Sequence, residues 1–299
     1  MPTVAAPPRI KLRNILFATD LSSSAPAVLS HAADLARRYG AVLYTVHVLP
    51  HMPFVEATGP GPEQAEMLAN EQMPALMNSA SLQGIEHKEL IVQGEVSKIL
   101  SRLVRERGID LILMGTGGRK GLGKLLLGSV AEEVFRNAEC PVITMGPHAT
   151  RWGTDGKLEH ILFATDFGPE SLHGLPYAIS LAEENRARLT LLHVAPEPGV
   201  TMPEFLPMID PRERVAYTKH HLCALLPEVT QLSHDPQCIV EFGPAAATIV
   251  KIATLSTDMI VMGVKRPAAL TKHLGEGVAY QVICNAPCPV LTVSARYHG

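Results

Sequence analysis

The stretch that decides the fold covers residues 110–129 and reads DLILMGTGGRKGLGKLLLGS. Its apolar start, 111–114, indicates a strand, and the glycines after it indicate a loop in which backbone N–H groups lie open. Gly128 and Ser129 then begin a segment whose apolar residues recur at helical spacing. A helix start behind a basic, glycine-rich loop favours an anionic ligand such as a phosphate chain. A plain turn between strand and helix would show the same glycines.

The chain contains the same pattern twice. The segment NILFATD at 14–20 reappears as HILFATD at 160–166, and DLILMG at 110–115 reappears as DMIVMG at 258–263. The motif CPV likewise occurs at 140–142 and at 288–290. Such repetition indicates two copies of one domain in tandem. We expect the first copy to span 1–148 and the second 149–299.

Within each copy, short apolar runs alternate with helical patterns, which predicts an α/β fold with a doubly wound, five-stranded parallel sheet of the Rossmann-like kind. In the first copy we expect strands at 15–19, 42–48, 89–92, 111–114 and 142–145, and helices at 25–39, 63–81, 96–107 and 129–137. In the second copy we expect strands at 161–165, 189–194, 239–242, 259–262 and 290–293, and helices at 171–184, 213–226, 245–254 and 278–284.

Composition narrows the class of protein. The chain of 299 residues has 46% hydrophobic and 18% charged residues, as in soluble globular proteins of about two domains. A formal net charge of -3 disfavours a nucleic-acid partner, and no apolar run is long enough to cross a membrane. The five cysteines show no paired framework, so we expect reduced thiols. These features together predict a cytoplasmic protein.

Other chemical signals are weaker. The segment GRKGLGKL at 118–125 nearly matches a phosphate-binding P-loop, but Leu125 stands where a hydroxyl must hold magnesium. The histidines lack the spacing of metal ligands, and no nucleophile with its base can be chosen. The sequence therefore predicts neither a catalytic residue nor a metal site.

Taken together, the motifs resemble the universal stress protein family in its tandem, two-domain form. The resemblance rests on ILFATD ending at Asp20, on His47 followed by Val48, on the spacing Gly-x2-Gly-x9-Gly-Ser from Gly115 to Ser129, and on CPV at 140–142. It implies a fold like that of the adenine nucleotide alpha hydrolases and a site for ATP, with Mg²⁺ as a candidate companion. Carried over residue by residue, the nucleotide-binding positions are Ala18, Thr19, Asp20, Val48, Met114, Gly115, Gly118, Gly128, Ser129 and Val130.

The resemblance also implies a role for each group. In family members that bind ATP, the aspartate after the first strand and the glycine after the fourth hold the ribose, and the residue after the histidine meets adenine through its backbone. The Gly-Ser pair and its neighbours hold the phosphates. The second copy departs from this pattern, with Arg266 in place of Gly118, Glu276 in place of Gly128 and Gly277 in place of Ser129. A carboxylate repels phosphate, so we expect ATP in the first copy and weak or no binding in the second.

The predicted function is that of an ATP-binding regulatory module of a stress response. Two alternatives stay open: slow ATP hydrolysis, for which no general base can be named, and a dimeric scaffold that needs no nucleotide. The family resemblance further implies that the two copies pair through their last strands, and it favours a homodimer. The sequence does not indicate a downstream protein partner.

Overall fold

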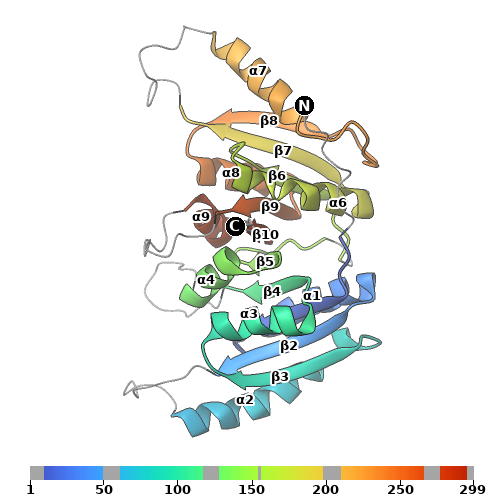
Figure 1. Cartoon of the computed structure of the whole chain (residues 1–299), viewed down its shortest axis with the longest axis vertical. Coiled ribbons are helices and arrows are strands. Elements are labelled where there is room, and N and C mark those ends of the chain that lie inside the picture. The colour runs from blue at the N-terminus through green and yellow to red at the C-terminus, as the bar shows by residue number, and fades with distance from the viewer. Residues whose placement is uncertain are drawn as a thin grey trace. The chain divides into compact units, whose positions relative to one another are not determined.

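The computed structural model describes residues 10–49, 61–116, 128–153, 156–197, 210–265 and 277–294. The chain divides into two compact units (Figure 1). The N-terminal unit spans Lys11–Met145, and the C-terminal unit is built on Gly146–Gly299. Ile10 belongs to the C-terminal unit, where its N–H donates a hydrogen bond to Ser180 Oγ at 2.9 Å.

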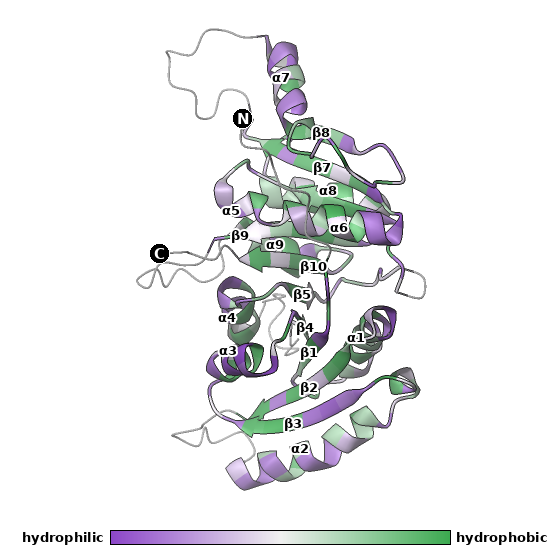
Figure 2. Cartoon of the chain, turned by 45° about the vertical axis from the view of Figure 1, so that its right-hand side comes forward, coloured by the Kyte–Doolittle hydropathy of each residue, from purple (hydrophilic) through white to green (hydrophobic). Residues whose placement is uncertain are grey.

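The N-terminal unit is a parallel sheet with the strand order β3-β2-β1-β4-β5. In the described part of the chain its elements are β1 (Asn14–Thr19), α1 (Ala25–Tyr39), β2 (Val42–Leu49), α2 (Pro62–Met77), the 3-10 helix η1 (Ala80–Leu82), β3 (His87–Gln93), α3 (Val96–Arg107), β4 (Leu111–Gly115), α4 (Ser129–Asn137) and β5 (Val142–Met145). Figure 2 shows α3 and α4 on one face of these strands and α1 on the other. The unit is therefore doubly wound, as its sequence predicts.

The C-terminal unit repeats this plan with the strand order β10-β9-β6-β7-β8, again all parallel. Its described elements are β6 (His160–Ala164), α5 (Pro169–Leu172), α6 (Leu175–Asn185), β7 (Arg188–Ala195), α7 (Pro211–Cys223), β8 (Gln237–Phe242), α8 (Ala245–Ser256), β9 (Met259–Val264), α9 (Val278–Asn285) and β10 (Val290–Ser294). The expected fold class is confirmed for both units.

The central strands are buried because helices cover both of their faces. Ile15 and Leu16 in β1 and Ile161 and Leu162 in β6 are each 0% exposed. Such strands read as continuous apolar runs rather than as alternating patterns, which is why the runs could be recognised in the sequence. In the described residues no helix is both long and apolar enough to span a bilayer.

Two of the expected helices are interrupted in the structure. The helix expected at 63–81 ends at Met77, with Pro74 in its last turn, and the short η1 follows separately. The helix expected at 171–184 is broken into α5 and α6 at Gly174. A Cβ at Gly174 would lie 3.0 Å from the backbone nitrogen of Gly263, so the break brings backbone against backbone. Pro176 in the first turn of α6 also prevents an unbroken helix, because it has no N–H to donate.

The expectation that all cysteines are reduced is wrong for two of them. Cys223, the last residue of α7, forms a disulfide with Cys238 in β8, with the two Cα atoms 5.9 Å apart. The remaining cysteines, Cys140, Cys284 and Cys288, are free thiols and are buried. Burial, together with the nearby charge of Asp258, raises the pKa of Cys288 to about 12, so this thiol is unreactive near neutral pH.

Candidate functional site

Strand register in the N-terminal unit brings several of the predicted site residues to one edge of the sheet. Ala18 in β1 lies opposite Met114 in β4, and Thr19 lies opposite His47 in β2, one residue before Val48. Gly115 ends β4, and Asp20 follows β1 as an exposed residue. The order of the strands reverses between β1 and β4, which is where open α/β sheets bind their ligands.

A tight turn holds Asp20 at this edge. The N–H of Leu21 donates to Thr19 Oγ1 at 3.0 Å, and the N–H of Ser22 donates to Asp20 Oδ1 at 2.9 Å. Leu21 has a φ of 57°, a left-handed conformation that side chains rarely adopt. The sequence does not reveal this conformation, because a leucine is not a residue that signals positive φ. The turn thus orients the Asp20 carboxylate through one of its oxygens.

His47 ties β2 to the same turn. Its Nδ1 lies 2.9 Å from the carbonyl oxygen of Thr19. A carbonyl only accepts hydrogen bonds, so Nδ1 carries the proton, and in the neutral ring Nε2 is the free acceptor. The contact fixes the end of β2 beside β1, and the backbone of Val48 is positioned with it. His47 is therefore a structural residue next to the predicted site, as its place inside an apolar strand indicates.

The glycine-rich loop starts and ends at hydrogen-bonded residues. The Thr116 N–H donates to Met145 O at 3.1 Å, and the Gly128 N–H donates to Thr116 O at 3.3 Å. Helix α4 begins directly after Gly128, and Val130 in its first turn is 39% exposed. Gly118 and the rest of the loop at 117–127 lie outside the described residues, as does the side chain of Ser129.

Two glycines of the site have no packing reason to be glycine. A Cβ added to Gly115 would meet only Val28 Cγ2, at 3.6 Å, and one added to Gly128 would meet Thr116 O at 3.4 Å. Both are ordinary van der Waals distances. Neither Gly115 nor Gly128 has a positive φ, so the backbone conformation does not require glycine there either. Their small size thus fits the close approach of another molecule, such as a phosphate or a ribose, to the backbone.

The corresponding glycine of the C-terminal unit is explained by packing. A Cβ on Gly263, the counterpart of Gly115, would overlap the backbone carbonyl oxygen of Glu170 and would lie 2.6 Å from that of Ser171. Both carbonyls belong to α5, which packs directly on the end of β9. Here the backbone of α5 occupies the position of a Cβ, whereas at Gly115 a Cβ would have only an ordinary contact with Val28.

The turn after the first strand is nevertheless the same in both units. In the C-terminal unit the Phe167 N–H donates to Thr165 Oγ1 at 3.0 Å, and Phe167 has a φ of 66°. Burial works to raise the pKa of Asp166, but hydrogen bonds from Ser171 and Gly168 outweigh it and hold that pKa below its ordinary value. His193 Nδ1 donates to Thr165 O at 2.9 Å, as His47 does to Thr19. Arg266 and Glu276, the predicted departures, lie outside the described residues.

No cluster of three or more histidine, cysteine or acidic side chains suited to a metal ion occurs within the described ranges. The candidate site is accordingly a backbone-rich edge with one carboxylate, Asp20. Such an arrangement offers N–H donors to an anion and a carboxylate acceptor to hydroxyl groups.

Comparison with known proteins identifies the family. The profile of the universal stress protein family matches residues 11–145 and 157–294, so the chain belongs to this family and contains its domain twice. The strand order and the duplicated turn described above agree with that assignment.

Relatives are found both as single domains and as parts of longer proteins. A universal stress protein of Methanocaldococcus jannaschii is 31% identical over 138 residues, which cover 44% of this chain and 81% of that protein. A Na(+)/H(+) antiporter of Synechocystis is 30% identical over 195 residues, 64% of this chain but only 27% of the antiporter. A universal stress protein structure from Archaeoglobus fulgidus, 20% identical, covers 94% of this chain and 98% of its own with a TM-score of 0.65, so it shares the fold over the tandem length.

Proposed function

We propose that this protein is a nucleotide-binding regulatory protein of a stress response, and that its N-terminal unit binds ATP at the carboxyl edge of β1, β2 and β4. The observation that carries the proposal is the contrast between Gly115 and Gly263. The chain fills the space at Gly263 with α5, whereas Gly115 has only ordinary contact with Val28. The C-terminal unit binds ATP weakly or not at all.

The residues at this edge have the chemistry that ATP requires. The carboxylate of Asp20 accepts hydrogen bonds from ribose hydroxyls, beside Gly115, and the backbone of Val48 faces the adenine edge. The first N–H groups of α4, at Ser129 and Val130, have no partner within the helix, since its first intrahelical bond runs from Glu132 N to Gly128 O. These groups, with the loop that contains Gly118, suit the phosphates. Ala18, Thr19 and Met114 supply the backbone beneath the ligand.

Mg²⁺ is expected to arrive with the triphosphate. This ion is usually bound through substrate phosphates and few protein carboxylates, so the proposal requires no dedicated metal site. Binding measured with and without Mg²⁺ will show whether the ion contributes.

Calorimetric titration of the full chain with ATP tests the proposal. We expect one ATP per chain and a loss of affinity of about tenfold or more in Asp20→Ala, because a charge-assisted hydrogen bond contributes about 1.5–3 kcal/mol. Gly128→Glu, which copies residue 276 of the other unit, should abolish binding. Asp166→Ala is the matched control and should bind like the wild type.

Two ATP molecules bound with equal affinity would contradict the assignment to one unit. Unchanged affinity in both Asp20→Ala and Gly128→Glu would place the site elsewhere. No binding at all would favour the nucleotide-independent scaffold. Phosphate release in the steady state, measured with Mg²⁺, addresses the remaining alternative, because a regulatory binding module should show little turnover whereas an ATPase would show sustained release.

We further propose a homodimer and a cytoplasmic location, both of which rest on the family resemblance and on the composition. Analytical ultracentrifugation with and without ATP measures the assembly state and any change that the nucleotide causes. The predicted pairing of the two copies through their last strands stays a prediction.

A further inference from the structure

Helix α7 is held to its sheet by few buried side chains. Among its described side chains only Leu222 is buried, at 0% exposure, and Tyr217 is 67% exposed. The guanidinium of Arg214 lies 5.5 Å from the centre of the Phe242 ring in β8 and adds a weak contact. Figure 2 shows hydrophilic turns along much of α7, in contrast to the hydrophobic β7 beneath it. Apolar packing alone therefore anchors this helix poorly.

The counterpart helix α2 is anchored differently. It buries Ala69 and Met73, at 2% and 1% exposure, and the segment after it buries Leu82 and Ile85. The N-terminal unit has its single cysteine, Cys140, elsewhere, so α2 has no covalent link to its sheet. The disulfide between Cys223 and Cys238 thus links α7 to its sheet, whereas buried side chains anchor α2 in the N-terminal unit.

The two bonded cysteines differ in their exposure to solvent. Cys223, at the end of α7, is an exposed residue, whereas Cys238 is buried at 7% exposure. We therefore expect a thiolate from solution to attack at Cys223, with Cys238 as the leaving group. The three other cysteines are buried and do not compete for such a reagent.

We propose that the Cys223–Cys238 disulfide is a redox-active modification site that exchanges with a dithiol reductant, and that its reduction releases the end of α7 from β8. One thiolate of the dithiol attacks Cys223 Sγ, the bond to Cys238 breaks, and the Cys238 sulfur leaves with the electron pair and takes up a proton. The second thiol of the reductant then attacks the mixed disulfide and frees Cys223 as a thiol. The dithiol is oxidised to its disulfide as the protein gains two electrons and two protons.

Release follows from what remains after the bond is broken. The disulfide joins residues 15 apart in sequence, and removing such a link restores freedom to the connecting segment. Between the two cysteines, Gln231 N–H donates to Glu183 Oε1 at 2.6 Å and ties the connection to α6. After reduction, buried Leu222 and the contact of Arg214 with Phe242 still hold α7 to the sheet.

Hydrogen exchange of the full chain, read by mass spectrometry, tests the proposal. The disulfide is first formed with oxidised dithiothreitol, and intact mass after alkylation in denaturant should show three free thiols, and five after reduction. Reduction should speed exchange of α7 peptides by about tenfold or more, because a short cross-linked loop is opened. Peptides of α2, which has no cysteine, are the internal control and should not change.

Cys223→Ser should reproduce the fast exchange of α7 without reductant and should not respond to dithiothreitol. Trp152, the chain's one tryptophan, is buried in the C-terminal unit, and its fluorescence shows whether that unit stays folded. Failure of native protein to form this disulfide would overturn the proposal, as would identical α7 exchange in the oxidised and reduced wild type. If Cys223→Ser unfolds, the wild-type comparison alone decides.

Discussion

The N-terminal and C-terminal units share the turn after the first strand but differ in what packs against the glycine of the fourth strand, Gly115 or Gly263. In both units a threonine hydroxyl accepts the N–H of a residue with positive φ, Leu21 in one and Phe167 in the other. Each such conformation costs about 1 kcal/mol or more, so the turn belongs to the fold rather than to one ligand. Asp20 alone therefore does not indicate a nucleotide. The room for a Cβ at Gly115, which Gly263 lacks, distinguishes the two units.

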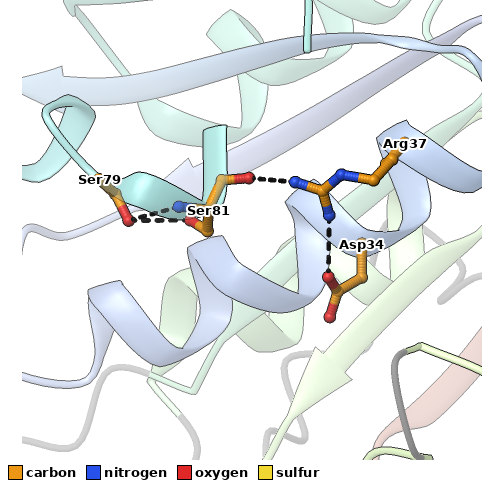
Figure 3. Close-up of polar contacts among 4 residues, drawn as sticks. All are labelled: Asp34, Arg37, Ser79 and Ser81. Carbon is orange, nitrogen blue, oxygen red and sulfur yellow. Dashed lines mark hydrogen bonds and ion pairs between the residues drawn. The ribbon is translucent and has the colours of Figure 1, made fainter. Parts of the chain in front are cut away.

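The units also differ in the hydrogen bond that holds the segment after α2 in one unit and after α7 in the other. In the N-terminal unit Arg37 Nη2 donates to Ser81 O at 2.6 Å, while Nη1 contacts Asp34 at 3.2 Å (Figure 3). In the C-terminal unit the partner at the same place on the helix is Glu183, which instead accepts from the Gln231 N–H. The same connection is thus made with opposite charge, which shows that the tie is retained while its chemistry is not.

The largest expected effect separates the two glycines. Gly263→Ala should lower the free energy of unfolding by about 2–3 kcal/mol, because the new methyl group overlaps the α5 backbone. Gly115→Ala should cost less than about 1 kcal/mol, since its methyl group meets only Val28, yet it should weaken ATP binding. Urea unfolding and ATP titration of both variants measure the two properties. Equal loss of stability in both would remove the basis of the comparison.

A smaller effect concerns His160, whose counterpart in the N-terminal unit is Asn14. Burial lowers the pKa of His160 from its ordinary 6.5, and Arg188 acts in the same direction. The unfolded chain therefore takes up the proton at higher pH, so the stability due to neutral His160 is fully present above about pH 6.5 and is lost as pH falls toward the folded pKa. Unfolding followed by Trp152 fluorescence at several pH values measures the loss.

His160→Asn is the matched control for this pH dependence, because it places the residue of the N-terminal unit at the same position. The variant should lose less stability on acidification than the wild type. Other groups, including His31, whose pKa burial also lowers, are present in both proteins and cancel in the difference. Parallel pH profiles for the two proteins would show that His160 does not contribute.

The smallest effect concerns the hydrogen bonds from Arg37 to Ser81 and from Gln231 to Glu183. Arg37→Ala should lower the unfolding free energy by about 0.5–1 kcal/mol, because Arg37 is 48% exposed and surface contacts are screened by water. Glu183→Ala should cost a similar amount in the other unit. Hydrogen exchange near Ser81 and Gln231 locates each effect, and a loss spread over a whole unit would argue against a local tie.

Most of the fold could be predicted because it depends on local patterns. The buried strands are continuous apolar runs, and the duplication supplied each pattern twice. The helix expected at 171–184 was wrong because its break at Gly174 is set by contact with Gly263, about ninety residues away in the chain. The pairing of Cys223 with Cys238 could not be foreseen either, since spacing alone does not show which cysteines approach each other.

The candidate site was predictable in part for a simple geometric reason. Carboxyl ends of parallel strands meet at one edge, so the sequence pattern alone places Asp20, Val48 and Gly115 close together. The left-handed turn at Leu21 could not be predicted, because leucine is not a residue that signals positive φ, and its bond to Thr19 Oγ1 is visible only in the structure. The tautomer of His47 could not either, because it depends on a contact with the carbonyl oxygen of Thr19 in the neighbouring strand. The role of Gly118 stays a prediction.

The sequence by itself determined that this protein is a tandem pair of doubly wound α/β domains, since repetition and apolar periodicity are properties of the chain alone. Only the tertiary structure decided that the α5 backbone packs against Gly263 while, in the described part of the chain, no backbone packs in the same way against Gly115. It also decided that α7 is held by a disulfide. The physical reason is that packing and covalent pairing depend on distances between residues far apart in the chain, which no local pattern records.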